Sequence, residues 1–278
     1  MTPEVSARSG RVDYACTDLE GRLIVGDSAE RPHYAASTMK LMVLAELFRQ
    51  RDAGSLQLDE RLVLPESFPS AVDGRPYRLE ESDRDPELLG AVGERLSIGE
   101  LAEGMITRSS NEATNVLIGR IGLESLQGTL SALALGGSRL ERPIGDRRAE
   151  EAGRRNIVTP LDLCRVLAAI GSGRAAGPDS TEVMLGYLRR QLSRDGIAAG
   201  LPPDVVTGSK DGWVEGVLHD AALVWPPHGP AYAMAICTEG FSDWGSARSA
   251  VRSLASRLHA LVLEVRQAGA PDLGSSPR

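Results

Sequence analysis

The residues best suited to chemistry in this sequence are a serine and a lysine three positions apart, Ser37 and Lys40. Of its 31 basic residues, 29 are arginine and only 2 are lysine, so the presence of lysine at these two positions calls for an explanation. Arginine keeps its proton in proteins, whereas a lysine that is buried or beside another cation can lose its proton and act as a base. Lys40 stands in the apolar run MKLMVLAEL, where a solvated charge would be out of place.

The spacing of this pair fits nucleophilic catalysis. The run from Thr38 to about Arg51 has helical length and strong helix formers, with Ser37 at its N-terminal edge. Residues three apart share a helix face, so the lysine amine could take the hydroxyl proton as the serine attacks. Backbone N–H groups at a helix N-terminus could stabilise an oxyanion. The pattern S-x-x-K is weak alone, but the scarcity of lysine makes it rarer here.

Two further segments complete a pattern. Ser109-Ser110-Asn111 precedes the predicted helix NEATNVLIGRI, and Lys210-Asp211-Gly212 lies just before or on a strand. In order and spacing, these segments resemble the S-x-x-K, S-D-N and K-T-G motifs of the class A β-lactamase and penicillin-binding-protein superfamily. The resemblance runs from about Arg11 to the last helix and includes the stretch NIVTPLDLCRVL.

This resemblance implies four catalytic residues. Ser37 would be the acylated nucleophile, Lys40 its base, Ser109 the proton shuttle to the leaving nitrogen, and Lys210 a source of positive field.

The resemblance also implies a substrate-binding group. Asn111 would hold the substrate amide, and the backbone N–H groups of Ser37 and Trp213 would form the oxyanion hole. His219 could face the substrate in the place of a carboxylate-binding cation, although a purely structural histidine is the alternative. The implied binding residues are Asn111, Asp211, Gly212, Trp213 and His219.

The sequence departs from the family in the loop before the TP-starting helix, which in class A β-lactamases carries the glutamate that activates the deacylating water. Aligned on R-L-x-R, that position falls at Ile144, and no E-x-x-L-N is present. Asp146, Glu150 and Glu151 are nearby carboxylates, and each has the alternative of a solvated loop charge. Asp146 is the best candidate for a substitute base.

A second departure is Asp211, which replaces the hydroxyl residue of K-T-G. A carboxylate here would repel a substrate carboxylate and could attract an amine or neutralise Lys210. We hypothesise that the native substrate lacks the carboxylate of a typical β-lactam, or presents a cation or neutral amide at this point.

The expected function is therefore a β-lactamase-like serine hydrolase that forms a Ser37 acyl-enzyme with a β-lactam or a related amide or ester, with slow or non-standard deacylation. Two alternatives remain open. One is an acyltransferase or DD-peptidase-like enzyme with a non-β-lactam substrate, and the other is a catalytically degenerate binding protein of the same fold.

The resemblance implies an α/β (α+β) fold in which an antiparallel sheet is flanked by terminal helices and an all-α domain is inserted. We expect residues 1–36 and 201–278 to form the α/β domain, residues 37–200 the all-α domain, and the active site to lie between them. Expected elements are a hairpin over 11–36, helices at 97–107, 111–121, 124–134, 159–171 and 180–194, strands at 217–226 and 231–239, and a last helix with the stripe Val251, Leu254, Leu258, Leu261 and Val265.

Composition narrows the remaining classes. The net charge of −7 and the aromatic content of 4% argue against a nucleic-acid partner. The four histidines lack paired metal-ligand spacing, so we expect no metal and no cofactor. Cys16, Cys164 and Cys237 read as buried free thiols. We expect a monomer without a membrane span that is cytoplasmic as written, or periplasmic or secreted if the N-terminus is incomplete.

Overall fold

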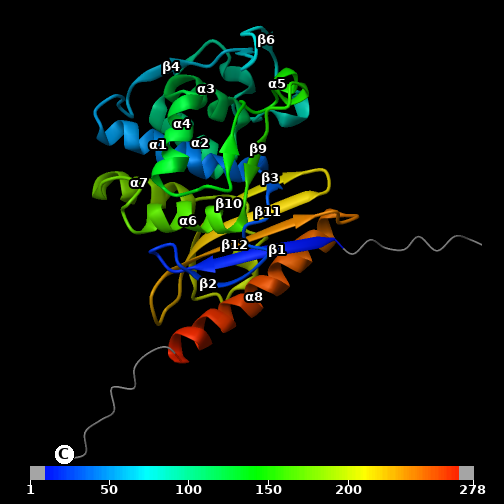
Figure 1. Cartoon of the computed structure of the whole chain (residues 1–278). Helices are drawn as coiled ribbons and strands as arrows, with labels where there is room; N and C mark the ends of the chain where they lie inside the picture. The colour runs from blue at the N-terminus through cyan, green and yellow to red at the C-terminus, as the bar shows by residue number, and fades with distance from the viewer. Residues whose placement is uncertain (1–9, 269–278) are drawn as a thin grey trace, which may run out of the picture.

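A five-stranded antiparallel sheet forms the middle layer of the protein (Figure 1). The computed structural model describes residues 10–268. Both ends of this range supply strands, which lie in the order β10-β11-β12-β1-β2. The strands are β1 (Arg11–Thr17), β2 (Leu23–Asp27), β10 (Val206–Val214), β11 (Val217–Trp225) and β12 (Tyr232–Glu239).

The last helix, α8 (Trp244–Ala268), covers one face of the sheet (Figure 1). Its buried face consists of Ala247, Val251, Ala255, Leu258 and Val262, at spacings of three and four residues that place them on one stripe. The stripe predicted from the sequence was correct at Val251 and Leu258. Leu254 is partly buried against the same core, whereas Leu261 and Val265 are exposed, because the buried stripe runs through Ala247, Ala255 and Val262 instead.

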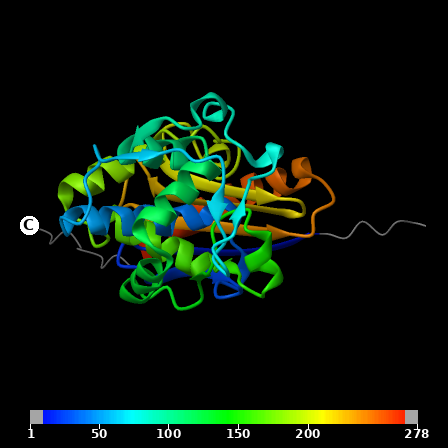
Figure 2. The same ribbon diagram turned by 90° about the horizontal axis from the view of Figure 1, so that it is seen from above.

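Seven helices form the layer on the opposite face, which Figure 2 shows from above. Helix α1 is buried over its first nine residues, 40–48. Helix α6 packs directly on the strands β1, β11 and β12. The helices are α1 (Lys40–Asp52), α2 (Ile98–Thr107), α3 (Asn111–Ile121), α4 (Leu123–Ala132), α5 (Arg147–Glu151), α6 (Pro160–Gly171) and α7 (Pro178–Arg189).

Short strands interrupt this helical layer. They make three small sheets, β3-β9-β8, β4-β7 and β5-β6. Residues 37–200 are therefore not purely helical, although helices dominate them. The strands are β3 (His33–Tyr34), β4 (Arg61–Val63), β5 (Phe68–Pro69), β6 (Pro76–Tyr77), β7 (Arg95–Ser97), β8 (Arg139–Leu140) and β9 (Asn156–Val158).

Helix ends follow local capping chemistry. Ser97 and Glu100 form a reciprocal capping box at the start of α2, and Thr159 with Pro160 begins α6. Four 3₁₀ turns connect other segments: η1 (Ala36–Met39), η2 (Glu81–Asp83), η3 (Leu89–Ala91) and η4 (Ala198–Gly200). No helix within residues 10–268 is long and apolar enough to cross a membrane. All three cysteines are buried free thiols, as predicted.

Candidate active site

Lys40 lies at the centre of the site and is completely buried at the start of α1. Its Nζ atom is 3.0 Å from Ser37 Oγ and 3.1 Å from Ser109 Oγ. The same nitrogen donates to the backbone oxygen of Ser109 at 2.6 Å and to Oδ1 of Asn111 at 2.8 Å. Four residues that the sequence placed in one site therefore meet at one amine.

The surroundings of Lys40 favour its neutral amine. Burial lowers its pKa well below the usual value, and the nearby ammonium of Lys210 lowers the pKa further. Carboxylates of Asp211, Glu112 and Asp85 oppose this effect without reversing it. A neutral amine carries a lone pair, which is the property that a general base requires.

Ser37 lies in the 3₁₀ turn η1 rather than at the first turn of an α-helix. The preceding residue, Ala36, has a positive φ of 44°, a conformation that is costly for a residue with a side chain. Strand β10 passes close to this turn at Gly212. A Cβ atom there would lie 2.8 Å from the backbone nitrogens of Ser37 and Thr38. Gly212 thus allows the strand to approach the nucleophile.

The Ser109–Asn111 segment reaches Lys40 through a strained turn. Ser109 has a φ of 61°, again in the left-handed region. Ser110 then caps α3, since its hydroxyl accepts a hydrogen bond from the backbone N–H of Ala113. Asn111 is fixed on both sides, because its Nδ2 donates to the carbonyl of Asp83 at 2.9 Å. Ser110, which stands where the family motif S-D-N has aspartate, therefore serves as the N-cap of α3.

Lys210 and Asp211 form an ion pair on β10, which places the KDG segment on a strand. Lys210 is completely buried, and its Nζ donates to Asp211 Oδ1 at 2.7 Å and to the Asp211 carbonyl at 2.8 Å. Burial opposes the charge of Asp211, but the Lys210 ammonium and a hydrogen bond from Ser193 outweigh it, so the carboxyl pKa is lowered. Much of the positive charge of Lys210 is therefore neutralised within the pair.

A cavity of about 180 Å³ opens beside the nucleophile. Ser37, Asn111 and Trp213 line it, as the sequence predicted for a substrate site. Ser109, Lys210 and Asp211 are not among its lining residues. These residues contact the site through Lys40 instead. Ser109 forms a hydrogen bond with the Lys40 amine, and the charges of Lys210 and Asp211 shift its pKa.

Ile144 also lines this cavity, so the position at which the family carries its glutamate holds an apolar side chain. Asp146, predicted as the substitute base, does not line the cavity. It is fully buried, and its carboxylate accepts hydrogen bonds from Ser70 Oγ at 3.0 Å, Ala71 N at 2.7 Å and Ala149 N at 3.1 Å. Asp146 instead caps α5 and ties the loop at residue 70 to it.

His219 is not a cation that faces the substrate. The ring is completely buried, and burial lowers its pKa to about 4, with nearby His33 adding to the shift. Its Nδ1 accepts from Thr238 N at 3.2 Å, so Nε2 carries the proton and donates to the Tyr34 carbonyl at 3.0 Å. His219 is therefore a neutral anchor for the chain three residues before Ser37, which is the structural alternative that the sequence left open.

Sequence reasoning missed five polar residues in the cavity wall: Tyr34, Asp83, Arg142, Arg147 and Asn156. Arg142 is buried, and its Nη2 pairs with Glu150 at 2.8 Å and contacts the Tyr34 hydroxyl at 3.3 Å. Asn156 accepts from the backbone nitrogens of Glu141 and Arg142. The aligned R-L-x-R motif contained Arg142 and could have signalled its role.

The fold and the motif geometry together define a protein of the β-lactamase/transpeptidase-like fold. The model of the β-lactamase enzyme family matches residues 2–262, and the chain belongs to that family.

Relatives that are named β-lactamases are similar to this chain. The β-lactamase of Streptomyces lavendulae is 28% identical over 247 residues, which cover 86% of this chain and 76% of that protein. The β-lactamase of Streptomyces albus G is 27% identical over 232 residues, covering 80% and 72%. These bacterial relatives indicate a hydrolase.

Solved structures share the fold. The β-lactamase of Sphaerobacter thermophilus DSM 20745 superimposes with a TM-score of 0.77 at 27% identity, covering 93% of this chain and 94% of that one. PBP-A gives a TM-score of 0.76 at 24% identity over 94% and 93%, a likeness in fold alone.

Proposed function

We propose that this protein is a serine hydrolase of the β-lactamase family in which Ser37 forms an acyl-enzyme readily and water releases it slowly. The substrate class is a β-lactam or a related amide or ester. The observation that carries the proposal is the contact of the buried Lys40 amine with Ser37 Oγ at 3.0 Å.

The hydrogen bonds of Lys40 set the direction of proton transfer. A neutral amine has two N–H donors and one lone pair. The Ser109 carbonyl and Asn111 Oδ1 can only accept, so they take the two donors. The lone pair is left for a hydroxyl, and the Ser37 O–H can donate to it. As Ser37 Oγ attacks the carbonyl carbon, its proton passes to Lys40.

Collapse of the tetrahedral intermediate then needs a proton for the leaving nitrogen. Ser109 Oγ lies 3.1 Å from Lys40 Nζ and can relay that proton. The C–N bond breaks, the nitrogen takes up the proton and becomes an amine, which in a β-lactam stays tethered through the opened ring, and Ser37 retains the acyl group as an ester. The N–H groups of Ser37 and Trp213 are the proposed oxyanion donors, with Gly212 permitting their approach.

Deacylation lacks a comparable arrangement. Hydrolysis needs a base that takes a proton from water beside the ester, and Ile144 has no such atom. Two carboxylate residues line the cavity, Asp83 and Glu150. Arg142 engages Glu150 in an ion pair at 2.8 Å, and Asp83 is exposed in the turn η2, so neither takes the place of the family's glutamate at Ile144. We expect the acyl-enzyme to accumulate.

The test is intact mass after incubation with penicillin G, paired with turnover of a chromogenic cephalosporin. A persistent mass gain on Ser37 with little turnover supports the proposal. Fast turnover without accumulation indicates an efficient β-lactamase. No adduct and no turnover would exclude β-lactams as acylating substrates.

Transfer of the acyl group to an amine is the second candidate, favoured by the same apolar Ile144. An amine nucleophile is more reactive than water and depends less on a strong base. Addition of an amine acceptor to the isolated acyl-enzyme should then release Ser37 faster and yield an amide product.

A further inference from the structure

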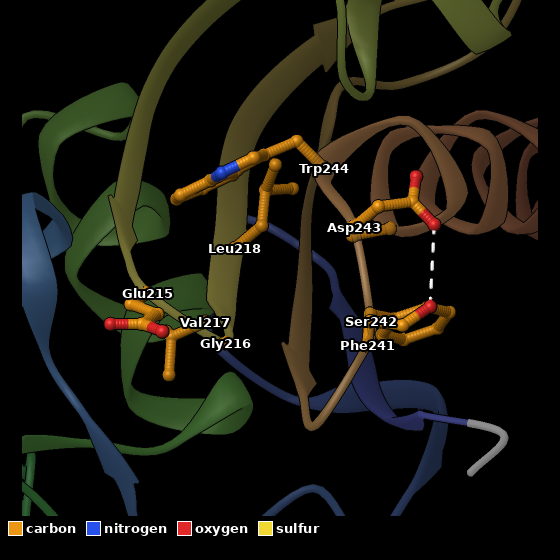
Figure 3. A pocket seen from close by; sticks show the side chains of 9 residues that line it. Glu215, Gly216, Val217, Leu218, Phe241, Ser242, Asp243 and Trp244 are labelled. Atoms are coloured by element: carbon orange, nitrogen blue, oxygen red, sulfur yellow. Dashed lines mark hydrogen bonds between the residues drawn. The ribbon is translucent and has the colours of Figure 1, made fainter. Parts of the chain in front are cut away.

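A second cavity of about 310 Å³ lies at the end of strand β10, beyond the catalytic cavity. The turn between β10 and β11 forms one wall, and the segment leading from β12 into α8 forms the other (Figure 3). Its lining residues are Glu215, Gly216, Val217, Leu218, Phe241, Ser242, Asp243, Trp244 and Ala247.

Two tryptophans connect this cavity to the catalytic one. Trp213 lines the catalytic cavity, and its ring meets the Trp244 ring edge-on, with centroids 5.1 Å apart and planes at 89°. Both rings are exposed, Trp213 at 57% and Trp244 at 39%. Large aromatic surfaces left in water beside a site are typical of ligand contacts. A substrate extending from Ser37 along β10 would pass over Trp213 and meet Trp244.

The charge in the second cavity is negative. Glu215 is exposed at the hairpin turn, and among residues 10–268 no hydrogen bond or ion pair engages its carboxylate. Asp243 stands on the opposite wall (Figure 3), where its carboxylate caps α8 through Ser246 N at 2.8 Å and Ser246 Oγ at 2.7 Å. The positive N-terminus of α8 offsets Asp243. Glu215 is therefore the free anionic group.

The floor of the cavity is apolar, since Leu218 and Ala247 are buried there. Phe241 lies over Gly10, where a Cβ atom would be only 2.1 Å from the ring, so the glycine leaves room for the phenyl group. An apolar floor, an exposed indole and a free carboxylate together suit an apolar group that carries a positive charge.

We propose that this second cavity is a subsite for the distal part of the acylating substrate, and that it takes an aromatic or aliphatic group ending in a substituted ammonium. The inference rests on the proposed acylation of Ser37 and adds the substrate class. It agrees with Asp211, which disfavours an anionic substrate near Lys210. Glu215 follows Gly212 by three positions, at the end of β10, and three steps of extended chain span roughly 10 Å, so the cation must lie about that far beyond the acyl carbon.

The test uses two penicillins with the same extended side chain, one ending in a trimethylammoniophenyl group and the other in the isosteric tert-butylphenyl group. The second-order rate constant for acylation of Ser37 is measured by intact mass for each. The wild-type protein should prefer the cationic probe by about tenfold, the size of one exposed charge and cation–π contact.

Substitution Glu215→Gln should reduce that preference to about twofold or less, and Trp244→Ala should slow acylation by the cationic probe about tenfold. Glu264→Gln is the matched control, because it removes the same charge from an exposed position farther along α8 and should preserve the preference.

Equal rates for the two probes in the wild type, or a preference that survives Glu215→Gln, would overturn the subsite while leaving the proposed function intact. Absence of any Ser37 adduct with either probe would overturn both. A change of sedimentation behaviour in Trp244→Ala without a change in preference would assign the cavity to self-association instead.

Discussion

The two walls of the catalytic cavity use their polar residues differently. Behind the wall formed by η1, polar atoms of Ser37, Asn111 and the Ser109 turn converge on Lys40 within 2.6 to 3.1 Å. On the wall formed by residues 139–156, the polar atoms bind one another. Arg142 pairs with Glu150, Asn156 holds backbone nitrogens, and Asp146 caps α5.

This difference separates the two halves of a hydrolytic cycle. In the proposed function the first wall supplies the nucleophile, the base and the proton relay, and it contains strained turns at Ala36 and Ser109. The segment of the second wall also contains carboxylates, Asp146 and Glu150, but their contacts stabilise the loop itself. The comparison shows that the contacts proposed for acylation are all present in this structure, whereas the position of the family's hydrolytic glutamate holds Ile144.

The largest predicted effect is loss of the base. Lys40→Arg keeps a positive charge but cannot supply a neutral amine, so acylation by penicillin G should fall about 10³-fold. The rate constant is measured by intact mass, with thermal unfolding to verify the fold. A variant that retains a tenth of the wild-type rate would contradict the role given to Lys40.

The second prediction restores the missing group. Ile144→Glu places a carboxylate on the cavity wall, and hydrolysis of the trapped acyl-enzyme should accelerate about 10²-fold, within the range for general base catalysis. Ile144→Gln is the control, because glutamine has nearly the same shape as glutamate but cannot act as a base. Equal acceleration in both variants would attribute the effect to space or polarity instead.

The third prediction concerns the ion pair on β10. Asp211→Thr removes the carboxylate that neutralises Lys210, so acylation by the anionic penicillin G should rise about tenfold. The acylation rate with a neutral ester substrate should rise less in the same variant. An unchanged or lower rate with penicillin G would refute the idea that Asp211 selects against substrate carboxylates.

The smallest effect is a pH-dependent change in stability near the same strand. Asp220 stands opposite Asp211, and burial, aided by the Asp211 charge, raises its pKa to about 7. Between about pH 4 and pH 7 the folded protein holds a proton that the unfolded chain releases, so this group lowers stability as pH rises through that window.

Asp220→Asn does not titrate. The difference in Tm, variant minus wild type, should therefore grow by a few degrees from pH 4 to pH 7 and stay constant above. Carboxylates that do not interact with Asp220 titrate alike in both proteins and cancel in the difference. A Tm difference that does not vary with pH would contradict the assignment.

Much of this site was accessible from the sequence because its signals are local. The S-x-x-K spacing and the scarcity of lysine predicted Ser37 and Lys40 as a catalytic pair. Helix α3 begins and ends where the segment NEATNVLIGRI predicted. The fold class followed from the same motifs. The exact boundaries assigned to the two domains stay a prediction.

What failed depends on tertiary contacts. Asp146 looked like a free loop carboxylate, because nothing in the sequence shows that Ser70 and Ala71 fold back to it. His219 could be oriented in either direction until Tyr34 and Thr238 were seen to occupy both nitrogens. The two-residue strands β3, β5, β6 and β8 are too short to leave a periodic pattern.

The central claim is that acylation of Ser37 is much faster than its hydrolysis. A time course of intact mass, with peptide mapping of the modified residue after a single addition of penicillin G, measures both rate constants on one sample. The predicted result is a stoichiometric adduct on Ser37 that decays slowly. An adduct on another residue, or penicillin consumed in many turnovers without an accumulating adduct, would contradict the claim.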